Sequence, residues 1–249
     1  MDHRMTRTTR FAPTHHTHHA KPGGMRPTRL ERPVSWSDFR TAVRYDPGNR
    51  LLIAVPAISA KRAEHAWLGE AVTLHTRVGE AEVYRREYER GAVYWSQHTG
   101  AHEVHGEIAA RWRVAGGEAS FLGLPTTDEL RVDGARDAGG ARTAGCSHFE
   151  GGSIYWSARH GAAVVHGMVR DIWALLGWER STLGLPVADV RYDRETGVFS
   201  GCFEHGTIEW SPAGGPVISV TAPAASDDLL DPAERDTLER LHADFAPRG

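Results

Sequence analysis

The sequence predicts an α+β fold built as an array of about three β-hairpin-plus-helix repeats, because several long segments recur along the 249 residues. A Leu-Gly-Leu-Pro tetrapeptide occurs at 122–125 and 183–186, and a Gly-Ala segment occurs at 100–106 and 161–167. An aromatic nonapeptide occurs three times, at 88–96, 149–157 and 203–211. Leu122 and Leu183 are 61 positions apart, as are Gly100 and Gly161. One shared displacement relates whole units, and units of this size bury their apolar faces on each other.

A helix is expected over 106–115, because Val104, Ile108 and Trp112 are spaced by four and fall on one helix face. The second copy has the same spacing at Val165, Val169 and Trp173. A first, degenerate helix is expected over 55–67, followed by Leu-Gly-Glu at 68–70 where Leu-Gly-Leu-Pro is expected. The tetrapeptide itself predicts a rigid connector, since its Pro cannot continue a helix and its Gly admits unusual backbone angles.

The aromatic nonapeptide predicts the second strand of a β-hairpin, over 149–156, with Phe149, Ile154 and Trp156 as its apolar residues. Gly151-Gly152 marks either a bulge or a turn. The last hairpin ends at Trp210 with no helix directly after it. The array can therefore close on itself, with Ile208 near Ile58 of the first helix.

Three regions follow from this pattern. Residues 1–32 have almost no apolar side chains and are expected to be disordered. The repeat domain is expected over 33–220, with a short closing helix at 35–45 and units at about 52–97, 98–157 and 158–212. Residues 221–249 are expected to form a linker and an amphipathic helix with the apolar residues Leu238, Leu241 and Phe245. That helix either docks on the array or binds another protein.

The Leu-Gly-x-Pro, Phe-Glu-Gly-Gly-x-Ile-Tyr-Trp-Ser and Gly-Ala-x-x-Val-x-Gly motifs resemble the LGFP repeat, known mainly from actinobacterial surface proteins. The resemblance covers about 52–220. It implies a non-catalytic module that holds proteins at a mycobacterial-type cell wall, often behind a hydrolase or mycolyltransferase domain.

Composition excludes some partners and leaves the compartment open. A net charge of −3 gives no basic footprint for nucleic acid, and no apolar run approaches the length of a membrane span. Polar residues follow Arg4, Arg7 and Arg10, which predicts no signal peptide and a cytoplasmic protein, whereas the resemblance implies the cell wall. Cys146 and Cys202 could pair in an exported protein, but free thiols are favoured.

The best candidate binding surface is the outer face of the hairpin strands. Side chains alternate along a strand, so Tyr155 points away from Ile154 and Trp156, and Tyr94 is its equivalent in the earlier copy. Outward tyrosines offer a flat ring and a hydroxyl to a sugar, or else they pack against the neighbouring unit. The chain has eight tryptophans, and those at repeat positions either form core or stack on a glycan: Trp95, Trp156 and Trp210.

Two more pairs of equivalent residues are candidates for a binding site. Asp128 and Asp189 could bind a cation or a sugar hydroxyl, or form turns through their own backbone. His105 and His166 could hold a backbone carbonyl between units, or act as a base in a cleft. The histidines within 15–19 could chelate a metal, but without carboxylate or cysteine partners they predict no metal site.

The sequence shows no catalytic motif, and we expect no catalytic residues, cofactor or metal. The leading hypothesis is a non-catalytic cell-wall-associated module that recognises an actinobacterial polysaccharide such as arabinogalactan. The alternative is an intracellular protein-interaction scaffold with the C-terminal helix as one contact. A third hypothesis is an enzyme with a histidine-containing cleft between repeats.

Overall fold

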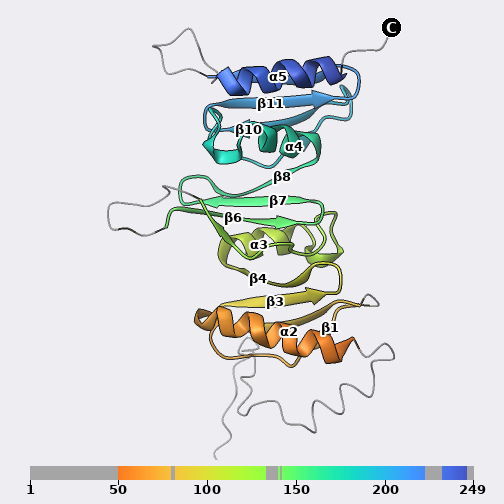
Figure 1. Ribbon diagram of the computed structural model, residues 1–249, viewed down its shortest axis with the longest axis vertical. Helices are drawn as coiled ribbons and strands as arrows, with labels where there is room; N and C mark the ends of the chain where they lie inside the picture. Colours follow the sequence, from red (N-terminus) through yellow and green to blue (C-terminus); the bar gives the residue numbers. More distant parts are fainter. Residues whose placement is uncertain (1–49, 80–81, 133–139, 141, 222–231, 246–249) are drawn as a thin grey trace, which may run out of the picture.

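The computed structural model describes residues 50–79, 82–132, 140, 142–221 and 232–245. In this part of the chain, three four-stranded antiparallel sheets alternate with helices in one open stack (Figure 1). The order along the stack is α2, first sheet, α3, second sheet, α4, third sheet and α5. The predicted α+β repeat array is confirmed. The expected N-terminal segment 1–32 and the expected helix 35–45 lie outside the described residues.

Each sheet has two central strands of the predicted hairpin, a third strand after them and a short edge strand before them. The first sheet contains β1 (Thr76–Arg77), β2 (Tyr84–Tyr88), β3 (Gly91–Ser96) and β4 (Gly100–His105). The second contains β5 (Leu130–Arg131), β6 (Ala144–Phe149), β7 (Gly152–Ser157) and β8 (Gly161–His166). The third contains β9 (Arg191–Tyr192), β10 (Phe199–Phe203), β11 (Gly206–Ser211) and β12 (Gly215–Val220).

The helices separate the sheets. The α-helices are α2 (Leu51–Glu64), α3 (Gly106–Val114), α4 (Gly167–Leu175) and α5 (Pro232–Phe245). A short 3-10 helix follows each of the first three: η1 (Ala66–Leu68), η2 (Gly117–Ala119) and η3 (Trp178–Arg180). None of the helices in the described part of the chain has both the length and the apolar character of a membrane span.

Helix α3 confirms the helix expected over 106–115, but its apolar face begins later than predicted. Val104 and Val165 lie in β4 and β8, so their assignment to the helices is wrong. The chain passes from strand to helix at Gly106 and Gly167, whose φ angles of 56° and 59° favour glycine. The valines still pack in the same cores as the helix residues that follow them.

The aromatic nonapeptide contains parts of two strands. Phe149 ends β6, and Gly152 begins β7, so the predicted single strand over 149–156 is wrong. Glu150 and Gly151 form the turn between the two strands. A Cβ atom on Gly151 would collide with the carbonyl oxygen of Phe121 in the connector. Glycine is therefore required here by a close approach of two backbones.

Each inner helix is shared by two sheets. Helix α3 packs against β4 of the first sheet and against β7 and β8 of the second. Trp112 is fully buried between them, with ring centroids 4.9 Å from Tyr94 and 5.6 Å from Phe149. Helix α4 repeats this arrangement: Trp173 is fully buried, 4.7 Å from Tyr155 and 5.0 Å from Phe203.

The connector after each helix is held by a glutamate of the same repeat. Glu150 and Glu204 accept hydrogen bonds from the backbone N–H groups of Leu124 (2.8 Å) and Leu185 (3.0 Å). The connector glycine beside Glu150 is Gly123, with a φ of 64°. The Leu-Gly-Leu-Pro and Phe-Glu-Gly motifs are therefore two parts of one structural contact.

The suggested closure of the array is wrong. Helix α2 packs on the first sheet and buries Ile58 there, whereas Ile208 lies in the core of the third sheet at the opposite end of the stack (Figure 1). The third sheet is covered instead by α5, which packs on β12 and buries Leu241. No helix directly follows β11, as expected, and the predicted C-terminal helix docks on the array.

Replacing Gly123 by Ala should destabilise the protein by more than the same change at Gly161. Both residues have φ near +70° (64° and 75°), where alanine costs about 1–2 kcal/mol. A Cβ at Gly123 would also collide with the Glu150 carboxylate, whereas nothing lies within 4 Å of a Cβ at Gly161. Urea unfolding of Gly123→Ala and Gly161→Ala measures the difference, and equal losses would contradict the glutamate contact.

Candidate functional site

The largest cleft that we describe lies where the first sheet meets the second. We call it the first junction and define it by Trp67, Glu103, His105, Glu129, Arg131 and Arg142. The cleft has a volume of about 530 Å³. Trp67 lies in η1, and Glu103 and His105 lie in β4 of the first sheet. The other three residues come from the segment that forms the second sheet, so neither sheet forms the cleft alone.

His105 is the centre of the first junction. Its Nδ1 lies 2.8 Å from Oε2 of Glu103, and its Nε2 lies 3.1 Å from Oε2 of Glu129. Glu129 also pairs with Arg142, and its backbone N–H donates to Oε1 of Glu103 at 2.9 Å. Both ring nitrogens therefore face carboxylates, which favours the imidazolium form.

The electrostatics agree with this geometry. Burial by itself would lower the pKa of His105, but the hydrogen bond and charge of Glu103 and the charge of Glu129 raise it above its usual value. Burial raises the pKa of Glu129, an effect that His105 and Arg142 partly offset. Glu103 is only 1% exposed, so its charge is held inside the protein by these contacts.

Local packing makes room for this network. A Cβ atom on Gly145, in β6, would collide with the Glu129 carboxylate. Trp67 lies on the other side, with its ring centroid 4.4 Å from that of His105 in an edge-to-face arrangement. Trp67 remains 40% exposed, and Arg90 donates to its carbonyl oxygen. The first junction thus combines an accessible aromatic side chain with fixed polar groups.

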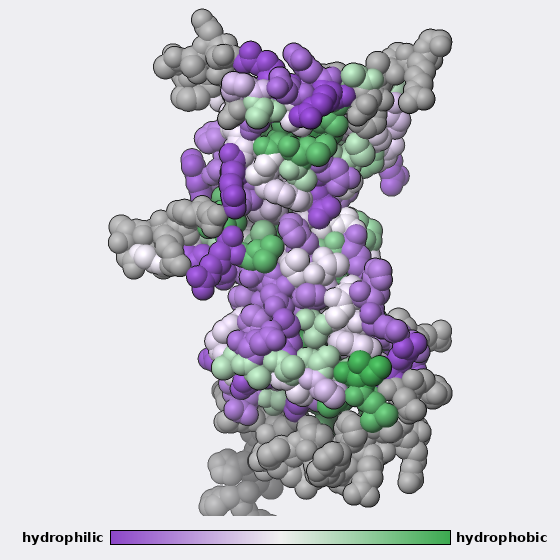
Figure 2. All heavy atoms as spheres, in the orientation of Figure 1, coloured by the Kyte–Doolittle hydropathy of each residue, from purple (hydrophilic) through white to green (hydrophobic). Residues whose placement is uncertain are grey.

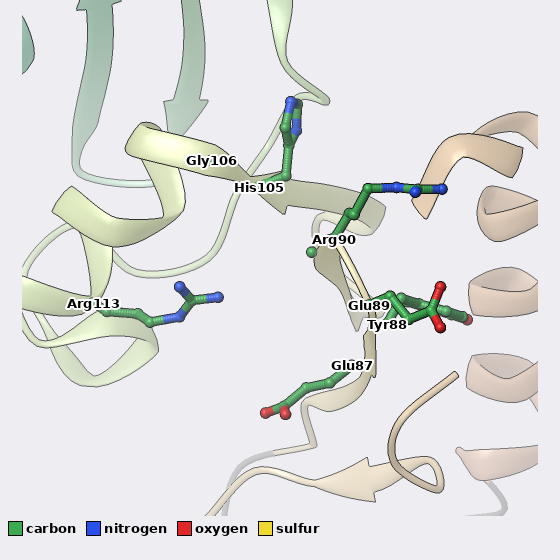
Figure 3. A pocket seen from close by; sticks show the side chains of 8 residues that line it. Glu87, Tyr88, Glu89, Arg90, His105, Gly106 and Arg113 are labelled. Atoms are coloured by element: carbon green, nitrogen blue, oxygen red, sulfur yellow. The ribbon is translucent and has the colours of Figure 1, made fainter. Parts of the chain in front are cut away.

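Two smaller cavities share His105 with the first junction. One, of about 310 Å³, lies between β2 and α3, where Arg113 extends from the helix toward the side of β2 that carries Glu87 (Figure 3). The other, of about 210 Å³, is lined by Glu107, Ile108 and Trp156 as well as by His105. His105 therefore lines all three cavities.

The expectation that Tyr94 and Tyr155 face solvent is wrong. They are 5% and 3% exposed, and each packs on the tryptophan of the next shared helix. The alternation along the strands is as predicted, but both faces of the sheet are covered. The tryptophans proposed either as core or as glycan-stacking residues belong to the cores. Trp95 is buried, and Trp156 and Trp210 are partly buried against the cores.

Asp128 and Asp189 connect neighbouring units. Their carboxylates accept the backbone N–H groups of Glu103 (3.1 Å) and Val164 (2.8 Å) in the preceding sheet. They also pair with the preceding helix, Asp128 with Lys61 and Asp189 with Arg111. These contacts replace the predicted turn through the residue's own backbone. Burial would raise the pKa of Asp128, but hydrogen bonds from His102, Lys61 and the Glu103 N–H hold it well below its usual range.

A possible cation site beside Asp128 already contains a positive group. Glu64, His65 and Asp128 bring ligand atoms within 4.8 Å of one another. The Lys61 ammonium, however, lies 2.8 Å from both carboxylates. It supplies the charge that a metal ion would bring. The histidines within 15–19 lie outside the described residues.

Cys146 and Cys202 are both free thiols, as favoured from the sequence. Cys146 is buried in β6, and burial raises the pKa of its thiol to about 12. Cys202 lies exposed in β10.

The sequence-based search named His105 but missed its partners Glu103, Glu129 and Arg142, as well as Trp67. The repeat alignment contained a signal for two of them. Glu103 and Glu129 correspond to Val164 and Val190, which are 61 positions further on. A buried position that is apolar in one repeat and acidic in another has a local role, and this comparison would have selected both glutamates.

The two repeat histidines should give opposite pH dependences of stability. The pKa of folded His105 lies above 6.5, so its contribution is present below pH 6.5 and is lost as pH rises through the raised value. Burial lowers the pKa of His166 below 6.5, so its contribution is lost as pH falls through 6.5.

Urea unfolding between pH 5 and 9 tests this with His105→Gln and His166→Gln. The difference in unfolding free energy between wild type and variant should shrink with rising pH for His105 and with falling pH for His166. The same sign for both residues would contradict the assigned contacts.

A model of the LGFP repeat matches the chain at residues 68–120 and 122–181. A search of curated proteins gave no match. The two matched segments each run from one connector through a sheet to the next helix, and the third sheet repeats this architecture beyond them. Residues 68–120 and 122–181 of this chain are therefore two LGFP repeats.

Proposed function

We propose that this chain is a non-catalytic, cell-wall-associated module that binds a polysaccharide of the arabinogalactan type, and that the first junction is its binding groove. The observation that carries the proposal is the exposed Trp67 ring beside a rigid set of polar groups. A sugar offers an apolar ring face and a rim of hydroxyl groups. An aromatic side chain suits the first, and fixed carboxylates and guanidinium groups suit the second.

The size and rigidity of the groove support the same function. A volume of about 530 Å³ falls within the usual range for small-molecule sites. The ion pairs of His105 and Arg142 hold the Glu129 carboxylate in one orientation before any ligand arrives. Preorganised polar groups lose less conformational entropy on binding.

The non-catalytic part of the proposal rests on the contacts of His105. A general base needs a free lone pair within reach of its substrate. Both nitrogens of His105 already face carboxylates of the protein, at 2.8 and 3.1 Å. Glu103, its closest partner, is almost completely buried.

The alternative of a protein-interaction scaffold loses part of its basis. That hypothesis used the apolar stripe of the C-terminal helix as a contact for a partner. Leu238 and Leu241 of α5 pack instead on the core of the third sheet. Glu234 of the same helix accepts a hydrogen bond from the Thr182 N–H at 2.8 Å.

Trp67→Ala should weaken binding of solubilised arabinogalactan by at least about tenfold, the usual cost of removing a central aromatic contact. Isothermal titration calorimetry measures the affinity. Trp67→Phe retains an aromatic face and should keep most of the binding affinity. Val114→Ala, at an exposed apolar residue at the end of α3, is the matched surface control.

Absence of binding by the wild-type protein would refute the proposed function. Wild-type binding that Trp67→Ala leaves unchanged would place the site elsewhere. Release of new reducing ends by the wild type, lost in Glu129→Gln, would refute the non-catalytic assignment.

A further inference from the structure

The stack contains a second junction that repeats the backbone of the first with uncharged side chains. We define it by Phe121, Val164, His166, Val190, Tyr192 and Phe199, which lie where the second sheet meets the third. Between the first and second sheets, the equivalent positions hold, in the same order, Trp67, Glu103, His105, Glu129, Arg131 and Gly145. The aromatic residue and the histidine are kept, and the charged residues are replaced by apolar ones.

Four rings form a continuous row across the second junction. The centroid of Phe121 lies 4.9 Å from that of His166, and His166 lies 6.4 Å from Phe199. Phe199 lies 4.5 Å from Tyr192. The two ends of the row are open to solvent, since Phe121 is 61% exposed and Tyr192 is 52% exposed. Single exposed apolar side chains are common, so it is the continuity of the row that makes it a candidate binding surface.

The side chains that define the second junction are uncharged apart from His166, whose pKa burial lowers. The buried side chains beneath it are Val164 and Val190. The Asp189–Arg111 ion pair lies beside the junction, since Asp189 accepts the Val164 N–H and its charge acts on His166. His166 also hydrogen-bonds the backbone of Val190, which holds its ring in place. On the face shown in Figure 2, apolar residues form small separate patches among polar ones. A short aromatic row of this kind suits a flat ligand better than a broad protein partner.

We propose that the second junction is a second subsite for the same polysaccharide, which binds uncharged sugar rings by stacking on Phe121 and Tyr192. The inference rests on the proposed function of the first junction. A sugar ring has an apolar face of C–H groups that fits an aromatic side chain. The open ends of the row favour a ring lying on the surface over an acyl chain, which needs to be enclosed.

The equivalent position of the third sheet is covered. Thr182 takes the place of Trp67 and Phe121, and its backbone N–H and hydroxyl both bind the carboxylate of Glu234 in α5. Within the described residues, the stack therefore offers two open junctions and one closed by its own helix.

Two subsites on one rigid stack would bind a polymer with higher avidity than either binds alone. The sugar is uncharged, so salt has no ligand charge to screen at either junction. The two contributions are therefore separated by substitution, and removing both aromatic contacts should cost more affinity than removing either one.

Binding of solubilised arabinogalactan tests the inference, with Phe121→Ala, Tyr192→Ala and Trp67→Ala, and Val114→Ala as control. Phe121→Ala and Tyr192→Ala should each weaken binding several-fold, up to about tenfold. Trp67→Ala combined with Phe121→Ala should bind more weakly than either single variant.

Phe121→Trp separates a binding effect from a folding effect, because it keeps the aromatic ring and should preserve affinity. If the wild type binds, Trp67→Ala weakens it and both second-junction variants bind like the wild type, the second subsite is refuted while the proposed function stands. If the wild type does not bind, the proposed function itself fails.

Discussion

The packing of one tryptophan between two sheets is the interaction on which the rest of the structure depends. Trp112 contacts Tyr94 of the first sheet and Phe149 of the second, and Trp173 makes the same two contacts one unit later. Because α3 and α4 each have a sheet on either side, burying one of these helices joins two units at once. The indole N–H of Trp112 donates to the carbonyl of Gly123 at 3.0 Å, which also fixes the connector.

The junctions follow from this packing. With the sheets held by a shared helix, the strand after each hairpin contacts the segment that leads into the edge strand of the next sheet. At the first junction a cleft forms there. Asp128 and Asp189 keep the same backbone contact at both junctions. The side chains beside them differ, with Glu103 and Glu129 at the first and Val164 and Val190 at the second. Architecture is thus repeated while the chemistry of each groove is free to change.

The repeat pattern predicted the alternation of hairpins and helices because period and displacement reflect local structure. It placed Tyr94 on the correct face of its strand, yet alternation cannot tell whether that face meets water or another helix. It also missed the Glu103–Glu129 contact, since the two residues are 26 positions apart and meet only when sheets stack. The closure of the array failed for the same reason: α5 follows a longer connection and covers the third sheet.

The central claim is that neighbouring sheets are coupled through the tryptophan of the helix they share. Hydrogen exchange measured by mass spectrometry on Trp112→Leu tests it most directly. We expect faster exchange in both β3 and β7, which lie on opposite sides of α3, with β11 much less affected. Faster exchange confined to one of the two sheets would contradict the coupling, and with it the account of how the junction grooves are held in shape.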